Sequence, residues 1–147
     1  MLRGVRGKAI YVTFCGLLSL IGSFLIALLL HDTGAAAHEN LGKLIFLDVL
    51  FAPIAETVLF QFLPFVICKR LNLSSPWTIA AMVLPFALAH ASHGIFTVSD
   101  CLYGGLLLAF TFLLWQLENN KVAIGMTFAV HAFHNGAALI LSSIFRV

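Results

Sequence analysis

Long apolar runs alternate with short polar breaks along this chain. An uncharged run extends from Ala9 to Leu30, and four further apolar stretches follow at about residues 43–67, 77–98, 101–117 and 122–144. A transmembrane α-helix needs about 20 mainly apolar residues, so the pattern predicts five membrane-spanning helices. The third stretch can end near Ala91 or near Val98, and Ser99-Asp100 predicts a turn before the fourth helix. Trp115 is expected to anchor the end of that fourth helix at the membrane interface.

The first apolar run also has features of a secretory signal. Arg3, Arg6 and Lys8 precede it, and the alanines at 35–37 resemble a cleavage site. However, its 22 residues exceed the roughly 7–15 of a typical signal core and suit a bilayer span. We therefore expect it to be retained as the first helix.

Composition supports a single all-α membrane domain over residues 1–147. Hydrophobic residues make up 61% of the chain and charged residues 10%, whereas soluble domains carry about 25% charged residues. The net charge of +2 and the scattered basic residues exclude a nucleic-acid partner. Lipid is the expected surrounding, and the sequence leaves the oligomeric state open.

Basic residues predict the orientation, because cytoplasmic loops are enriched in Lys and Arg. With the N-terminus inside, six basic residues face the cytoplasm (Arg3, Arg6, Lys8, Lys69, Arg70 and Lys121), against two outside (Lys43 and Arg146). The sequence therefore predicts an N-in, C-out arrangement.

Several polar residues interrupt the apolar spans at one depth. Glu56, His90, His131 and Asn135 lie 10–14 residues from the cytoplasmic ends of their helices, or roughly 15–21 Å at about 1.5 Å per residue. Such groups can simply join helices by hydrogen bonds. However, an ionisable group in a span costs at least about 2.5 kcal/mol and usually marks a site, so the coincident set favours a functional cavity.

Local spacing strengthens this interpretation. His131 and Asn135 are four residues apart and project from one helix face, as do Phe86 and His90. Pro53, three residues before Glu56, is expected to bend the helix and open space beside the carboxylate.

Three segments together resemble the ordered motifs of the CAAX-protease and bacteriocin-processing family of intramembrane proteases. They are Ala52-Pro53-Ile54-Ala55-Glu56-Thr57-Val58-Leu59-Phe60-Gln61, then Phe86-Ala87-Leu88-Ala89-His90, then His131-Ala132-Phe133-His134-Asn135. The resemblance covers residues 50–142, which form the expected protease-like core. It implies that Glu56 activates a water, that His90 assists it, and that His131 and Asn135 stabilise the oxyanion. It also implies a peptide or membrane-protein substrate, no cofactor or metal, and a place in the bacterial cytoplasmic membrane.

One motif departs from the family pattern. The family usually has two adjacent glutamates and an arginine five residues after the first, whereas this chain has Glu56-Thr57 and Gln61. Because Thr57 and Gln61 are four residues apart, we expect them to replace an ion pair by an uncharged, hydrogen-bonding pair.

Four functions compete at this point. The first is an intramembrane endopeptidase, and the second is a non-catalytic scaffold or bacteriocin self-immunity protein with the same fold. The intact set of Glu56, His90, His131 and Asn135 favours the endopeptidase, because a scaffold needs none of them. A zinc site on Glu56, His90 and His131 is a third reading, although the nearest histidine pairs are three residues apart rather than four. A small transporter is the weakest, since the sequence has no internal repeat.

Overall fold

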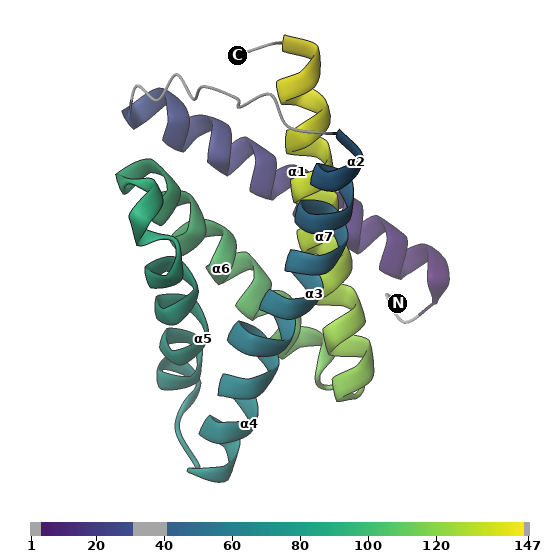
Figure 1. The fold of residues 1–147 in the computed structure, drawn as a ribbon. Helices are drawn as coiled ribbons and strands as arrows, with labels where there is room; N and C mark the ends of the chain where they lie inside the picture. Colours follow the sequence, from purple (N-terminus) through teal and green to yellow (C-terminus); the bar gives the residue numbers. More distant parts are fainter. Residues whose placement is uncertain (1–3, 31–40, 146–147) are drawn as a thin grey trace.

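The computed structural model describes residues 4–30 and 41–145, and this part of the chain is helical without strands. The alanines at 35–37 and Arg146, used above for the signal and orientation arguments, lie outside the described residues. The segments from α2 to α4 are continuous and form one rod (Figure 1). In chain order the helices are α1 (Val5–Leu30), α2 (Leu41–Leu44), η1 (Ile45–Phe51), α3 (Ala52–Glu56), η2 (Thr57–Phe62), α4 (Leu63–Arg70), α5 (Ser75–Ala89), η3 (Ala91–His93), α6 (Ile95–Trp115) and α7 (Asn120–Phe145).

Four of these helical units are long and apolar enough to cross a membrane. Within the described ranges they are Val5–Leu29, Ile45–Arg70, Ile95–Trp115 and Asn120–Leu141. The fifth, α5, has 15 residues and is therefore about 22 Å long, shorter than a hydrocarbon core of about 30 Å. The predicted all-α membrane bundle is confirmed, and of the two ends considered for the third helix the structure agrees with the one near Ala91, since α5 ends at Ala89.

The α2–α4 rod contains two π-helical segments, and a proline follows each of them. Proline has no N–H, and its ring collides with the carbonyl four residues earlier. The segments η1 and η2 are π-helical, and the Leu63 N–H bonds to the carbonyl of Val58, five residues back. Pro53 and Pro64 follow these segments at the second position of α3 and α4. The helix is therefore widened on both sides of Glu56, and the bend expected at Pro53 stays a prediction.

The turn between α5 and α6 lies at residues 90–94, and the predicted turn at Ser99-Asp100 is wrong. Gly94 has φ 97°, a backbone conformation that glycine adopts easily, and α6 begins at the next residue, Ile95. Ser99 and Asp100 lie inside α6. A carboxylate is accommodated there because Asp100 accepts a hydrogen bond from the Ser23 hydroxyl of α1.

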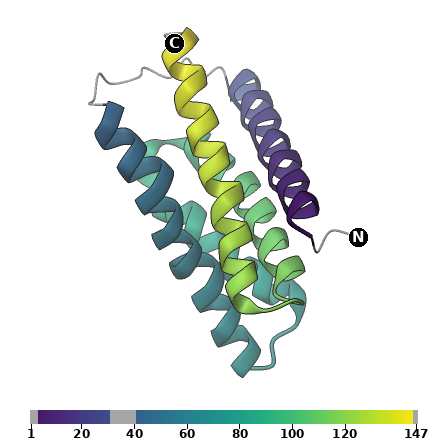
Figure 2. The same cartoon turned by 90° about the vertical axis from the view of Figure 1, so that its right-hand side faces the viewer.

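Helix α1 is an integral part of the bundle and lies beside α7, whose other side faces the α2–α4 rod (Figure 2). A Cβ added at Gly22 would lie 2.0 Å from Cε1 of Tyr103, so glycine permits the ring to cross α1 closely. The Tyr103 hydroxyl donates to the carbonyl of Leu18 at 2.8 Å. Near the start of α1, Lys8 Nζ lies 3.1 Å from Glu118 Oε1.

The interfacial role predicted for Trp115 is wrong. Its side chain is only 4% exposed and meets the Tyr11 ring edge to face, with centroids 5.5 Å apart. The Lys8 ammonium lies 5.4 Å from the centroid of the Trp115 ring. An interfacial tryptophan presents its ring to lipid headgroups, whereas Trp115 joins α6 to α1.

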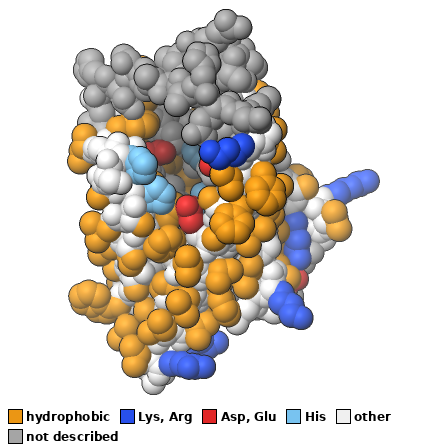
Figure 3. Space-filling model, viewed as in Figure 1, with side chains coloured by type: hydrophobic (Ala, Val, Ile, Leu, Met, Phe, Trp, Pro, Cys, Tyr) orange, Lys and Arg blue, Asp and Glu red, His pale blue; other side chains and the backbone are white. Residues whose placement is uncertain are grey.

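The outer surface of the bundle is apolar. Large side chains such as Phe14, Leu29, Trp77 and Leu88 remain exposed, and hydrophobic side chains cover much of the face in Figure 3. In water such a surface would favour aggregation, but in a bilayer it contacts lipid. The same view shows histidines and carboxylates gathered in the upper half of the molecule.

The N-in orientation is tested by labelling the two ends of α5. In a cysteine-free background, we expect Ser92→Cys in η3 to react with a membrane-impermeant maleimide added outside intact cells. Lys69→Cys, near the opposite end of α5, should react only after permeabilisation. Both positions are exposed to the surroundings of the protein. The reverse pattern would invert the predicted topology.

Candidate functional site

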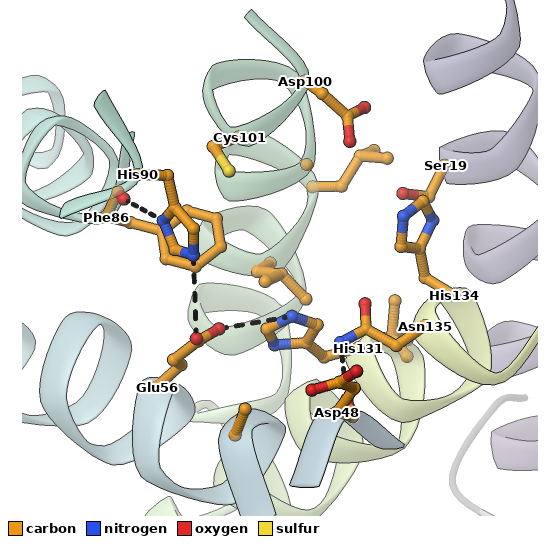
Figure 4. Close-up of a pocket in the computed structure, with 15 residues that line it drawn as sticks. Ser19, Asp48, Glu56, Phe86, His90, Asp100, Cys101, His131, His134 and Asn135 are labelled. Atoms are coloured by element: carbon orange, nitrogen blue, oxygen red, sulfur yellow. Dashed lines mark hydrogen bonds and ion pairs between the residues drawn. The ribbon is translucent and has the colours of Figure 1, made fainter. Parts of the chain in front are cut away.

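A cavity of about 240 Å³ opens between the helices of the upper half of the bundle. Figure 4 shows Glu56 on the α2–α4 rod directed toward the imidazoles of His90, after α5, and His131, on α7. Glu56 Oε1 lies 3.8 Å from His90 Nε2, and Glu56 Oε2 lies 3.5 Å from His131 Nε2. The three residues predicted from separate segments therefore meet around one carboxylate.

The three side chains differ in exposure. Those of Glu56 and His90 are 22% and 25% exposed, while that of His131 is 8% exposed. His90 lies just after the end of α5 rather than in the middle of a span, because α5 ends at Ala89. The carboxylate is therefore reachable from the cavity, whereas His131 forms its inner wall.

Phe86 positions both imidazoles, which explains its spacing from His90. Its carbonyl oxygen lies 2.8 Å from His90 Nδ1, so that nitrogen carries the hydrogen and donates it. The Phe86 ring meets the His90 ring with centroids 5.0 Å apart and the His131 ring at 5.9 Å, both edge to face. Since Nδ1 of His90 is the donor, the Nε2 of a neutral His90 presents its lone pair toward Glu56.

Asn135 lines the same cavity but does not contact Glu56. Its Nδ2 donates to the backbone carbonyl of Asp48 at 2.7 Å. This bond ties α7 to the π-helical segment η1 and uses one of the two hydrogens on the amide nitrogen. The four predicted site residues thus lie in one cavity, with Asn135 bonded to the backbone of Asp48.

The cavity also includes polar residues that the sequence interpretation did not assign to a site: Ser19, Asp48, Asp100, Cys101 and His134. Asp100 was not assigned to the site because the sequence predicts a turn at Ser99-Asp100. Asp48 is visible in the sequence as a carboxylate inside a span, which is the signal that could have added it. Ser19 carries no such signal, because a serine in a membrane helix is common.

The expected hydrogen-bonding pair of Thr57 and Gln61 is wrong. Both side chains are buried, at 0% and 1% exposure, yet the Thr57 hydroxyl and both polar atoms of the Gln61 amide have no hydrogen-bond partner in the described part of the protein. The four-residue spacing brings side chains together in an α-helix, but these two residues belong to the π-helical segment η2, which has more residues per turn.

A metal site was a further reading of Glu56, His90 and His131. Over residues 4–30 and 41–145, no group of three His, Cys, Asp or Glu side chains has an arrangement that could hold a metal ion. Independence from metal ions stays a prediction.

Fold and site define a polytopic helical membrane protein with a carboxylate between two histidines. Residues 39–137, about two thirds of the chain, match the type II CAAX prenyl endopeptidase Rce1-like family. The chain belongs to this family, which is a family of proteases, and the resemblance inferred from the three motifs is confirmed. No curated protein and no solved structure gives a significant match.

The unpaired Thr57 hydroxyl is tested by measuring the stability of a variant that lacks it. Thr57→Val removes a buried hydroxyl without a protein partner, so we expect the free energy of unfolding in detergent to stay unchanged or rise by up to about 1 kcal/mol. Thr111→Val is the matched control, because Thr111 is equally buried but its hydroxyl bonds to Tyr11 and to the Leu107 carbonyl.

The control should lower the free energy of unfolding by about 1 kcal/mol. If Thr57→Val destabilises the protein as much as Thr111→Val does, the Thr57 hydroxyl has a hydrogen-bond partner and is not left unpaired in η2.

Proposed function

We propose that this protein is an intramembrane endopeptidase in which Glu56 activates a water molecule. The observation that carries this proposal is the position of the Glu56 carboxylate, in a cavity of an apolar bundle, between the Nε2 atoms of two histidines from other helical segments. Burying these groups together in a membrane is costly, so their presence indicates a functional site.

The Glu56 carboxylate is free to accept a hydrogen from a water in the cavity. The gaps of 3.8 Å and 3.5 Å from Glu56 to the imidazoles are longer than a normal hydrogen bond, so the carboxylate oxygens keep lone pairs for a water hydrogen. The water oxygen then attacks the carbonyl carbon of the peptide bond while Glu56 takes its proton. The same proton passes to the leaving amine when the carbon–nitrogen bond breaks, which regenerates the carboxylate.

The negative charge on the carbonyl oxygen needs hydrogen-bond donors. Asn135 keeps one amide hydrogen after its bond to the Asp48 carbonyl. His131 can donate from Nε2 in one tautomer, and its Nδ1 has no hydrogen-bond partner among the described residues. We assign oxyanion stabilisation to these two residues and the transfer of protons with Glu56 to His90, whose lone pair faces the carboxylate.

The main alternative is a non-catalytic scaffold or bacteriocin self-immunity protein. The missing second glutamate and arginine of the first motif, replaced by Thr57 and Gln61, favour it. Against it, the altered pair does not line the cavity, while Glu56, His90, His131 and Asn135 all do. We place the activity in the bacterial cytoplasmic membrane, with a membrane-associated peptide as substrate.

Glu56→Gln separates these functions. It keeps the shape of the side chain and removes the base, so kcat for peptide cleavage by the purified protein should fall by about 10²–10⁴-fold. Glu118→Gln is the matched control, because Glu118 pairs with Lys8 on the exposed surface, away from the cavity. The control should cleave at the wild-type rate. Full activity of Glu56→Gln would exclude Glu56 as the base.

Metal chelation tests the metal-free mechanism. Because a carboxylate and imidazoles supply the base and the hydrogen-bond donors, dialysis against EDTA and phenanthroline should leave cleavage by the purified protein unchanged. Metal content is measured on the same samples. Loss of activity on chelation, restored by stoichiometric zinc, would show that the glutamate and histidines act as metal ligands instead.

A further inference from the structure

The proposed reaction leaves one wall of the cavity without a role. Asp100 and Gly104 line this wall from α6, four residues apart and therefore on one helix face, and Ser19 lines it from α1. In Figure 4, Asp100 and Ser19 lie across the cavity from Glu56. No heavy atom lies within 4 Å of a Cβ built at Gly104, so the wall borders open space.

Asp100 is held in place by a neutral partner, and it shares the cavity with the imidazole of His134. The Ser23 hydroxyl donates a hydrogen bond to Asp100 Oδ1, and this neutral partner comes from α1. None of the ion pairs found among the described residues includes Asp100. The described cavity lining contains three carboxylates, those of Asp48, Glu56 and Asp100, and no Lys or Arg.

Ser19 adds an independent sign that this wall binds a ligand. Ser19 is only 5% exposed, yet it lines the cavity. The Ser19 carbonyl oxygen lies 3.1 Å from the Ser23 hydroxyl, which shares its single hydrogen between this carbonyl and Asp100. None of the hydrogen bonds found among the described residues uses the Ser19 hydroxyl. Its hydroxyl therefore remains available, within the described structure, to a group that enters the cavity (Figure 4).

We propose that Asp100, with Ser19 beside it and Ser23 holding it, forms a subsite for a positively charged lysine or arginine side chain of the substrate. This inference rests on the proposed peptidase function for the identity of the ligand. An unpaired carboxylate in an apolar bundle is costly, and a cation from the substrate offsets that cost. A charge-assisted hydrogen bond of this kind also selects between otherwise similar side chains.

The subsite is tested first by binding, so that its outcome does not depend on catalysis. Glu56→Gln protein in nanodiscs is titrated with hydrophobic peptides in which lysine, norleucine or glutamate occupies one position, scanned along the peptide. Norleucine matches the lysine chain without its charge. Asp100→Asn in the same background keeps an oxygen acceptor for Ser23 and removes the charge. Glu118→Gln removes a carboxylate outside the cavity.

For at least one position, the lysine peptide should bind about tenfold or more tightly than the norleucine peptide, because only lysine can make the charge-assisted bond to Asp100. Asp100→Asn should reduce that ratio to near one, while Glu118→Gln should leave it unchanged. Absence of a lysine preference, or a preference that survives Asp100→Asn, would overturn the subsite.

Cleavage of the same peptides by protein with intact Glu56 then separates the two proposals. If lysine peptides bind through Asp100 but none is cut, the subsite stands and the peptidase proposal fails. If peptides are cut with equal kcat/KM whether they carry lysine or norleucine, the peptidase proposal stands and the subsite fails. A loss of binding by every peptide in Asp100→Asn, rather than of the lysine preference, would show that Asp100 only maintains the fold.

Discussion

The cavity of this bundle is organised around one carboxylate that lies between two imidazoles. Glu56, His90 and His131 come from three different parts of the chain. The Glu56 carboxylate oxygens lie 3.8 Å from His90 Nε2 and 3.5 Å from His131 Nε2. In an apolar surrounding each of these groups alone is costly, so the rod, the end of α5 and α7 are constrained to meet. Other features serve this meeting. Phe86 fixes both imidazoles, and the π-helical segments flanking Glu56 accommodate the prolines of the rod.

Helix α1 has a larger role than its place outside the family match suggests. The match begins at residue 39, after α1. Nevertheless α1 supplies Ser19 to the cavity wall and Ser23 to Asp100, and it packs against α6 and α7. The cavity is therefore completed by a helix that lies outside the residues matched by the family.

The sequence predicts the features that depend on composition and on strong periodic patterns. Apolar runs identify the helices, and the cost of a buried charge singles out Glu56, His90 and His131, which the structure brings together. Errors arise where the partner of a polar group lies on a distant helix. Asp100 looks like a turn residue until Ser23 is seen beside it, and Trp115 looks interfacial until Tyr11 covers it. The Thr57 and Gln61 pair fails because spacing arguments assume α-helical geometry, and η2 is π-helical.

We propose above all that Glu56 is the base with which this protein cleaves peptides in the membrane of its host. The most direct measurement compares, by mass spectrometry, the new peptide termini in membranes of host cells that carry wild-type protein or Glu56→Gln at equal abundance. We expect a set of termini that is present with the wild-type protein and absent with the variant, with substrates accumulating uncut in the variant. Identical sets of termini in the two membranes would contradict the account and leave the scaffold as the better description.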